Sequence, residues 1–436
     1  MKIEDSRWLT WILVISILLR VGAAVMLGNT VENLPGTADQ ISYHTLATRI
    51  LEGHGFSFGQ VWWPITRANE PTAHWSFLYT FYLVGVYGLL GVHPIAARLL
   101  QAVIVGFLQP LLTYLLAKRL IDRRAGIIAA GLNAIYAYFI YYAATLMTEP
   151  FYITAILGAL LASIRLADAV RMKEKLRWSA VLGLCLGCAV LLRQLFLLFV
   201  PFLLLWVWWV NRKESIRKAV VPLMVSLAIV TAMILPFTAF NYTRFHRFVL
   251  LNTNAGYALF WGNHPIYGTK FIPILPSNVV SYAELIPEEL RSLDEAALDQ
   301  ALMKRAVELI LADPGRYVLL SISRIPAYFM FWLSNDSGLI SNLSRVGSFG
   351  VFWPFMLAGL IRALVGKYRL TQGGLRSPVA LLALFGLVYT GIHVLTWALV
   401  RYRLPIDAVF LVFAAYAFCG IWDWWRARST RKVVSG

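Results

Sequence analysis

The chain is dominated by apolar runs that approach the roughly 20 residues an α-helix needs to cross a bilayer. Of its 436 residues, 59% are hydrophobic and only 14% are charged. This composition predicts an all-α polytopic membrane protein. The first run extends from Trp8 to Gly28 and is not followed by an evident small-residue cleavage site. We therefore expect it to be a retained membrane span and not a cleaved signal peptide.

Clusters of basic residues predict how the spans are oriented, because short cytoplasmic loops carry an excess of Lys and Arg. The five clusters are Lys118, Arg119, Arg123, Arg124; Arg165, Arg171, Lys173, Lys175, Arg177; Arg212, Lys213, Arg217, Lys218; Arg362, Lys367, Arg369, Arg376; and Arg426, Arg428, Arg431, Lys432. Pairs of apolar segments separate successive clusters, for example 125–144 with 150–167. The net charge of +17 then indicates loops that face anionic lipid and predicts no nucleic-acid partner.

Two apolar segments would break this parity if they crossed the membrane. We interpret 75–91, which is rich in aromatic residues, as a juxtamembrane or re-entrant helix on the outer face. By the same argument, we predict that 317–333, which contains Arg324, does not cross the membrane. The prediction is about ten true spans, within a range of roughly 10–13 set by boundary uncertainty.

This topology places the segments 29–94 and 240–346 outside. Asp39 opens a stretch with helical spacing that ends at Gly53, and Asp294 precedes an amphipathic stretch over 295–312. Asp39 either caps its helix or supplies a carboxylate to a site. The predicted organisation is 1–240 as an N-terminal transmembrane module whose first outer loop carries this acid, 241–346 as an outer-face loop with amphipathic helices, and 347–436 as C-terminal transmembrane helices.

The run Arg401-Tyr402-Arg403-Leu404-Pro405 lies between two apolar stretches near the end of the chain. Two guanidinium groups beside lipid are costly unless they bind an anion. Arg is always charged, and its planar fork suits phosphate. The motif therefore predicts a site for a lipid phosphate or a similar anion; the alternative is a pair of arginines that snorkel to headgroups.

Other polar residues on the predicted outer side extend this candidate site. They are Asp39, Glu70, His74, Glu149, Arg193, Asn252 and Asn263. Glu70 and His74 are four residues apart, so a divalent metal there is an alternative, but no His-Glu-x-x-His or comparable spacing indicates one. The three cysteines lie in apolar segments and imply no disulfide framework.

Several short motifs, taken in order, resemble those of the GT-C membrane glycosyltransferases. The likeness is to the branch that contains dolichyl-phosphate-mannose protein mannosyltransferases and bacterial aminoarabinose transferases. The motifs are Ala38-Asp39-Gln40-Ile41-Ser42-Tyr43, Leu51-Glu52-Gly53-His54-Gly55, Glu70-Pro71, Ala96-Ala97-Arg98-Leu99, Arg123-Arg124-Ala125-Gly126, Thr148-Glu149-Pro150, Leu191-Leu192-Arg193, Gly256 to Asn263, and Arg401 to Pro405. They cover most of the chain.

The resemblance implies an enzyme of the cell membrane, such as a bacterial inner membrane, that takes a sugar from a polyprenyl-phosphate carrier on the outer or periplasmic side. The catalytic acid of the family's first loop falls on Asp39. Many relatives carry a second acid directly after it, where this chain has Gln40. Many also have a Pro-Pro-aromatic run where this chain has Glu70 to Trp75. The acceptor therefore cannot be carried over from the family.

A mechanism follows as a hypothesis. Asp39 accepts the proton of the acceptor hydroxyl, while Arg401 and Arg403 stabilise the phosphate that leaves, so a single displacement inverts the sugar carbon. The candidate substrate-binding residues are Tyr43, Glu70, His74, Glu149, Arg193, Asn263, Arg401, Tyr402 and Arg403. The main alternative is a transporter or flippase of a lipid-linked or anionic substrate, although no repeated halves are detectable in the sequence.

Overall fold

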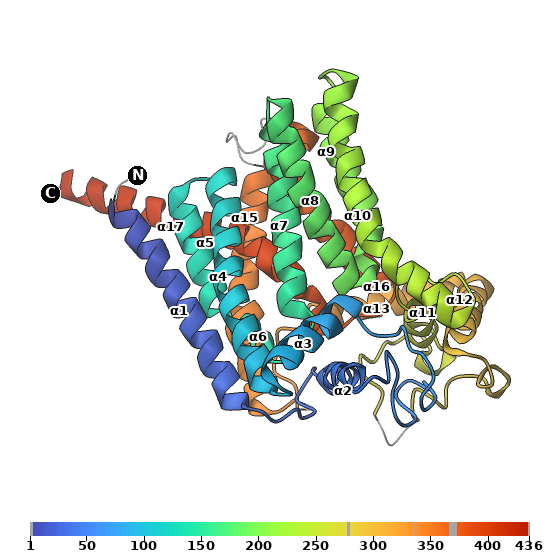
Figure 1. Ribbon diagram of the computed structural model, residues 1–436. Coiled ribbons are helices and arrows are strands. Elements are labelled where there is room, and N and C mark those ends of the chain that lie inside the picture. The colour runs from blue at the N-terminus through green and yellow to red at the C-terminus, as the bar shows by residue number, and fades with distance from the viewer. Residues whose placement is uncertain (1–2, 277–279, 336, 366–372, 435–436) are drawn as a thin grey trace.

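The computed structural model describes residues 3–276, 280–335, 337–365 and 373–434. In these ranges the regular secondary structure is helical, with two isolated β-bridges and no strands. Most of the long helices run side by side as a bundle, and several short helices gather at one end of it (Figure 1). The all-α, polytopic class predicted from composition is confirmed.

Nine helical stretches in the described ranges are long and apolar enough to cross a membrane. They are built on α1 (Ile3–Leu27), α4 (Pro94–Leu120), α7 (Glu149–Asp168), α8 (Met172–Leu192), α9 (Val200–Asn211), α10 (Ile216–Phe245), α15 (Val351–Val365), α16 (Pro378–Leu395) and α17 (Leu404–Val434). A tenth is formed if α5 (Arg123–Ile135) and α6 (Ala137–Ala143), which meet at a 56° bend, count as one broken span. The total agrees with the lower end of the predicted range.

The two apolar segments that were predicted not to span form helices too short to cross a membrane. The helix α3 (Phe77–Leu90) has 14 residues, and α13 (Pro314–Tyr328) has 15. A span needs roughly 20. In Figure 1, α3 lies obliquely at the end of the bundle, next to α2.

The helix starts predicted from acidic residues are confirmed at two places. The helix α2 (Asp39–Leu51) begins at Asp39, and α12 (Glu295–Ala312) begins directly after Asp294. The carboxylate of Asp294 accepts a hydrogen bond from the Ala297 amide and so caps α12. The short helix α11 (Ala255–Gly262) packs against α12.

A buried arginine binds the backbone at the bend between α5 and α6. Arg20, inside α1, donates to the carbonyl oxygens of Asn133 and Ala134, both at 3.2 Å, and to the hydroxyl of Ser16 at 2.5 Å. These carbonyls lie in the last turn of α5, where the break leaves them without intrahelical donors. The buried guanidinium group of Arg20 therefore supplies hydrogen bonds to the backbone of the neighbouring helix α5.

The C-terminal helices share a core with the N-terminal ones. The helix α17 packs against α4, α5 and α7 as well as against α15. The division of the chain into 1–240, 241–346 and 347–436 thus stays a prediction about sequence order, while the packing joins the first and last of these segments.

A single buried carboxylate joins the two segments predicted to face outside. Glu295 accepts hydrogen bonds from the Thr66 hydroxyl at 2.8 Å, the Ala73 amide at 2.7 Å and the Thr253 hydroxyl at 2.5 Å. Asn252 adds bonds from its side-chain amide to the carbonyls of Ala73 and Trp75. The loops 52–76 and 247–254 are therefore held together as one layer over the end of the bundle.

We expect Glu295→Ala to loosen this layer. The substitution leaves three donors without their acceptor, at about 1–3 kcal/mol for each one that stays buried. The melting temperature in detergent should fall and the 52–76 loop should become sensitive to protease, while Glu295→Gln, which keeps one carbonyl oxygen, should be milder. Glu289→Ala, at an exposed carboxylate, is the matched control. Equal melting of Glu295→Ala and this control would contradict the role of Glu295.

Candidate active site

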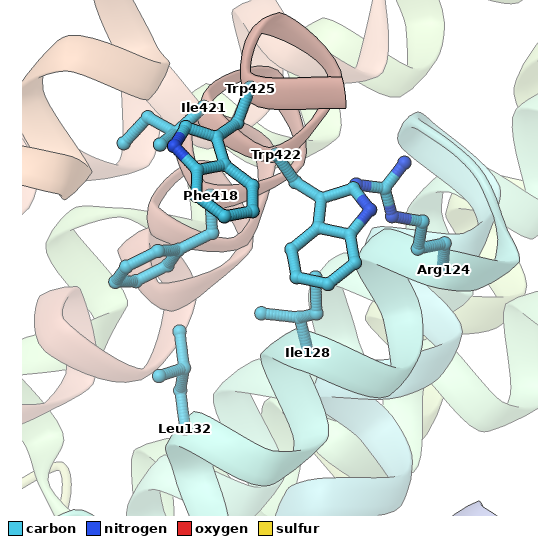
Figure 2. A pocket seen from close by; sticks show the side chains of 7 residues that line it. All are labelled: Arg124, Ile128, Leu132, Phe418, Ile421, Trp422 and Trp425. Atoms are coloured by element: carbon cyan, nitrogen blue, oxygen red, sulfur yellow. The ribbon is translucent and has the colours of Figure 1, made fainter. Parts of the chain in front are cut away.

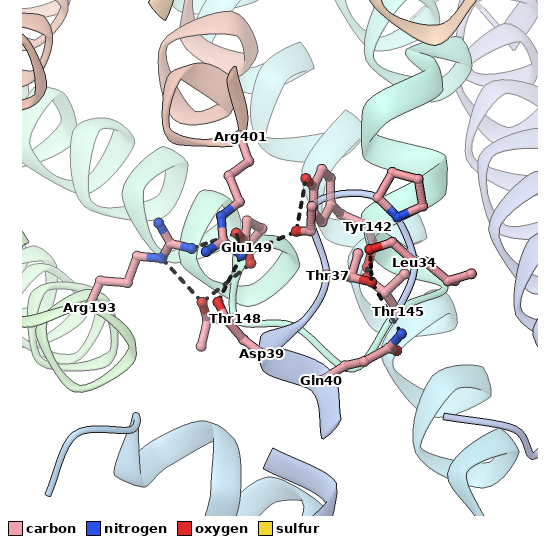
Figure 3. A network of polar contacts seen from close by, with 12 residues as sticks. Leu34, Thr37, Asp39, Gln40, Tyr142, Thr145, Thr148, Glu149, Arg193 and Arg401 are labelled. Carbon is pink, nitrogen blue, oxygen red and sulfur yellow. Dashed lines mark hydrogen bonds and ion pairs between the residues drawn. The ribbon is translucent and has the colours of Figure 1, made fainter. Parts of the chain in front are cut away.

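Four charged side chains form a continuous chain of ion pairs beneath this layer (Figure 3). Asp39 Oδ2 lies 2.8 Å from a terminal nitrogen of Arg401. The same Arg401 nitrogen lies 3.7 Å from Glu149 Oε1, which is 2.5 Å from Arg193 Nη2. Residues from four separate parts of the sequence are thereby brought together, and all four belong to the predicted site.

The two acids begin helices. The N-cap position of α2 is Ala38, so Asp39 lies inside the first turn and its carboxylate is directed to Arg401. Glu149 is the first residue of α7 and is only 1% exposed. Carboxylates are favoured at helix N-termini. The interpretation of Asp39 as a plain helix cap therefore does not describe this carboxylate.

The two arginines end or precede membrane helices. Arg193 follows α8 and also donates through Nε to the Thr148 hydroxyl at 3.2 Å. Arg401 lies in the 3₁₀ turn Val400–Arg403 and donates to the Gly36 carbonyl at 3.2 Å. The turn passes directly into α17, where Pro405 occupies the first turn as proline often does.

An aromatic stack supports both guanidinium groups. The Tyr402 ring centre is 5.1 Å from the Arg193 Cζ and 5.3 Å from the Arg401 Cζ, within cation–π range. The Tyr402 ring also stacks on His393, with 4.9 Å between the ring centres, and His393 in turn stacks on Tyr328. Sequence reasoning did not identify His393 as part of the site's support, since a lone histidine in an apolar helix carries no signal of its own.

Two of the four charged groups remain partly accessible. Asp39 is the most exposed of the four charged residues at 26%, and Arg401 is 14% exposed. Within the described ranges, the Nε of Arg401 is buried and has no hydrogen-bond partner. A buried N–H without an acceptor is costly, so a phosphate oxygen placed here would satisfy it.

The second arginine of the motif does not join this group. Arg403 is 0% exposed and pairs with Asp407 at 3.0 Å, and its Nη1 donates to the Tyr328 carbonyl at 2.7 Å. The Tyr136 hydroxyl donates to Asp407 at 2.8 Å. The cause is local: with about three residues per turn in a 3₁₀ helix, residues two apart point to different sides. The pattern Arg-Tyr-Arg therefore sends Arg401 to the Asp39 group and Arg403 into the protein core.

Tyr43 and His74 lie close to Asp39 without bonding to it. Burial raises the pKa of Tyr43, and the Asp39 charge raises it further. Burial lowers the pKa of His74, against the opposing charges of Glu295 and Asp39, and so favours a neutral imidazole. The His74 Nδ1 is 3.0 Å from the Thr253 carbonyl, which can only accept, so Nδ1 carries the proton and Nε2 is the acceptor.

Two other predicted site residues make their contacts elsewhere. Glu70 is partly exposed and pairs with Arg67 at 3.4 Å. Asn263 is fully buried at the end of α11 and accepts a hydrogen bond from Arg324 at 2.9 Å. Their roles as substrate ligands stay predictions. In the described ranges, no group of three or more His, Cys, Asp or Glu side chains is arranged to hold a metal ion.

The amide at position 40 is explained by its surroundings. The Gln40 Nε2 donates to the Glu32 carbonyl at 2.5 Å and to the Thr37 hydroxyl at 3.2 Å, while its oxygen accepts from Arg98 at 3.3 Å. A carboxylate here could accept from Arg98 but could not donate to Glu32. Gln40 therefore supports the loop that precedes α2 and is not a second acid of the site.

The fold is shared with known membrane glycosyltransferases. Residues 74–240 match the sequence model of the family described as dolichyl-phosphate-mannose-protein mannosyltransferase. The oligosaccharyltransferase of Archaeoglobus fulgidus in the apo form aligns over 100% of this chain with 17% identity and a TM-score of 0.62. The oligosaccharyltransferase AglB from the same organism, in complex with an inhibitory peptide and a dolichol-phosphate, aligns over 97% of this chain with 16% identity and a TM-score of 0.58.

A third structure, ArnT from Cupriavidus metallidurans bound to undecaprenyl phosphate, covers 94% of this chain and 78% of its own length, with 15% identity and a TM-score of 0.44. This chain spans about half the length of the archaeal structures, 52% in both. No curated protein sequence matches it significantly. The fold is that of the GT-C glycosyltransferases, as the sequence motifs predicted.

Replacing each arginine of the motif should lower the free energy of unfolding by a different amount. Arg403→Gln leaves Asp407 buried without its cation, and breaking a buried pair in this way costs about 3–5 kcal/mol. Arg401→Gln breaks a pair whose carboxylate remains accessible, which costs nearer to about 1 kcal/mol. Melting of the two purified variants in the same detergent checks this. Equal losses would show that the two arginines are not divided between site and core.

Proposed function

We propose that this protein is an integral membrane glycosyltransferase that moves a hexosyl or pentosyl group from a polyprenyl-phosphate carrier to an acceptor hydroxyl. The observation that carries the proposal is the chain of ion pairs from Asp39 through Arg401 and Glu149 to Arg193. It puts one accessible carboxylate beside two guanidinium groups. The archaeal structure that shares this fold was solved with a dolichol-phosphate.

The chemistry is a single displacement at the anomeric carbon. The acceptor oxygen forms the new bond, the bond from that carbon to the carrier's phosphate oxygen breaks, and the hydroxyl proton passes to Asp39. The leaving group departs as a phosphate monoester anion, so it needs positive charge more than a proton. Arg401 and Arg193 supply that charge, with Glu149 and Tyr402 keeping the two guanidinium groups oriented. One attacking oxygen and no covalent enzyme intermediate give inversion.

Binding of the donor and activation of the base are linked. In the structure the Oδ2 of Asp39 is engaged by Arg401 at 2.8 Å, so this oxygen is not free to meet an acceptor hydroxyl. The donor's phosphate competes with Asp39 for Arg401, whose buried Nε lacks a hydrogen-bond partner. When the phosphate takes a share of Arg401, the Asp39 carboxylate is released to contact the acceptor hydroxyl. The carboxylate is thus available to the acceptor only when a donor is present.

The orientation of the site is proposed from the basic clusters. With those clusters in the cytoplasm, the Asp39 end of the bundle faces the periplasm or the outside of the cell membrane, where acceptor lipids, glycans or proteins are found.

Single-cysteine labelling in a cysteine-free background should show this orientation. An impermeant thiol reagent applied to intact cells should label a cysteine at the exposed Glu52 position and should not label one at the exposed Lys173 position. Permeabilised cells, in which both should react, are the control. The reverse pattern would place the site in the cytoplasm and exclude the proposed donor orientation.

We expect Asp39→Asn to separate donor binding from turnover. Transfer from a synthetic polyprenyl-phosphate sugar in nanodiscs should fall by about 10²–10⁴, the usual contribution of a general base. Binding of the donor should be retained or strengthened, because the neutral amide competes less for Arg401. Both quantities are measured on the same preparation.

Asp294→Asn is the matched control, since Asp294 is a helix-start carboxylate of the same layer and Asn also caps helices well. It should transfer at the wild-type rate. Turnover of Asp39→Asn near that of this control would reject Asp39 as the base. Wild-type protein that translocates the intact carrier without transferring its sugar would instead support the flippase alternative.

A further inference from the structure

An aromatic cluster lies beside Asp39 in the layer over the end of the bundle. Tyr43 follows Asp39 by one turn, on the same face of α2. Its ring meets the Trp75 ring edge to face, with 5.6 Å between the ring centres. The Trp75 ring centre in turn lies 5.3 Å from that of His74 and 6.3 Å from that of Trp63. A single tyrosine therefore links the proposed base to the cluster of Trp63, His74 and Trp75.

Trp63 is exposed and yet held in place. It is 47% exposed, although its ring centre lies only 5.3 Å from that of the buried Trp261. It belongs to a turn that is closed by two backbone hydrogen bonds between Trp62 and Thr66, both 2.9 Å long. The Trp62 indole donates to the Ser42 hydroxyl of α2 at 2.8 Å. Because the turn is anchored before a ligand arrives, binding to the Trp63 ring requires little further ordering.

The cluster also offers one hydrogen-bond donor and one acceptor. Within the described residues, the indole Nε1 of Trp75 is buried and has no hydrogen-bond partner. His74 keeps its proton on Nδ1, which faces the Thr253 carbonyl, and so presents Nε2 as an acceptor. Burial lowers the pKa of His74, which favours the neutral ring. The three rings therefore bring polar atoms to the cluster but no charge.

The groove between α5 and α17 does not offer these features (Figure 2). Its volume is about 730 Å³, and it is lined by apolar and aromatic side chains and by Arg124, which pairs with Asp423. About 18 residues of α17, or about 27 Å, separate Leu404 beside the active site from Trp422 at the groove. No carboxylate is among the described residues that line it. An acceptor hydroxyl bound there could not pass its proton to Asp39.

We propose that Trp63, His74 and Trp75 form the acceptor subsite and that the acceptor is a carbohydrate. The inference rests on the proposed transferase function and names its acceptor class. A sugar ring has an apolar C–H face, which lies on the exposed Trp63 ring. Its edge carries hydroxyls, which both donate and accept and so match His74 Nε2 and Trp75 Nε1. Another hydroxyl of the same sugar then reaches Asp39.

Other acceptor classes fit the cluster less well. A hydrocarbon chain would cover the two polar atoms and leave both unpaired, which is costly. An anionic headgroup would find no cation among the three rings. A peptide backbone could satisfy the two polar atoms but presents no flat apolar face to Trp63.

The test is saturation-transfer NMR of the full chain in nanodiscs, without donor and with two probe mixtures. One mixture contains the methyl glycosides of glucose, galactose, mannose and N-acetylglucosamine, and the other contains short peptides with Ser or Thr. At least one glycoside should receive saturation at its C–H protons. Trp63→Ala should bind that glycoside about tenfold more weakly, as expected for the loss of a stacked ring. Trp332→Ala is the matched control, because Trp332 is 45% exposed and contacts Phe331, outside the cluster.

Two further variants support the reading. His74→Phe keeps an aromatic ring but removes Nε2, so it should weaken glycoside binding about fivefold, as for one lost hydrogen bond. Trp63→Leu keeps an apolar side chain against Trp261 and replaces Trp63→Ala if that variant fails to fold; it should lose the same affinity.

Because no donor is present, binding is measured separately from transfer. A wild-type protein that transfers sugar but binds no glycoside above empty nanodiscs would overturn the subsite alone, whereas one that binds glycosides and transfers nothing would overturn the transferase function alone. Equal affinity of Trp63→Ala and Trp332→Ala would also overturn the subsite. So would saturation of the peptides in place of the glycosides, which would assign the cluster to a protein acceptor.

Discussion

The arrangement of the candidate site depends most on the four charges that meet at Asp39, Arg401, Glu149 and Arg193. They come from the start of α2, the turn before α17, the start of α7 and the end of α8. Charges taken out of water are costly unless they are paired, and here each carboxylate contacts a guanidinium group. The pairs therefore require the N-terminal and C-terminal helices to pack together. The same requirement places the two guanidinium groups that we propose to hold the donor phosphate at the end of the bundle.

Around this centre, buried polar side chains serve the backbone at points where helices end. Arg98 donates to the carbonyls of Leu27 and Gly28 at the end of α1, and Gln101 donates to the carbonyls of Ala143 and Thr145 after α6. Carbonyls at a helix end lack intrahelical donors, and no water in the lipid would replace them. These side chains supply the missing donors, and so they lower the free-energy cost of turning the chain within or near the membrane.

Sequence reasoning identified what depends on local chemistry and on long apolar runs. The starts of α2 and α12, the short α3 and most spans follow from acidic residues, run lengths and basic clusters. What sequence reasoning could not resolve depends on tertiary contacts. Arg401 and Arg403 are equivalent in the motif. The 3₁₀ turn directs them to different sides, and the packing of α13 and Asp407 decides which of the two is buried in the core. From the sequence alone, Glu295 cannot be distinguished from any other residue of an amphipathic helix, because its three hydrogen-bond donors come from loops distant in the sequence.

The charge balance of the site explains why a donor phosphate would act as both substrate and switch. Two acids and two arginines leave little net charge, so the site attracts no anion by excess charge alone. An anion gains a place there only by displacing a carboxylate from an arginine. Glu149 is nearly fully buried and held by Arg193, whereas Asp39 is the more exposed carboxylate of the two. We therefore propose that Asp39 is the carboxylate that gives way, and its released oxygen is the atom proposed to accept the hydroxyl proton.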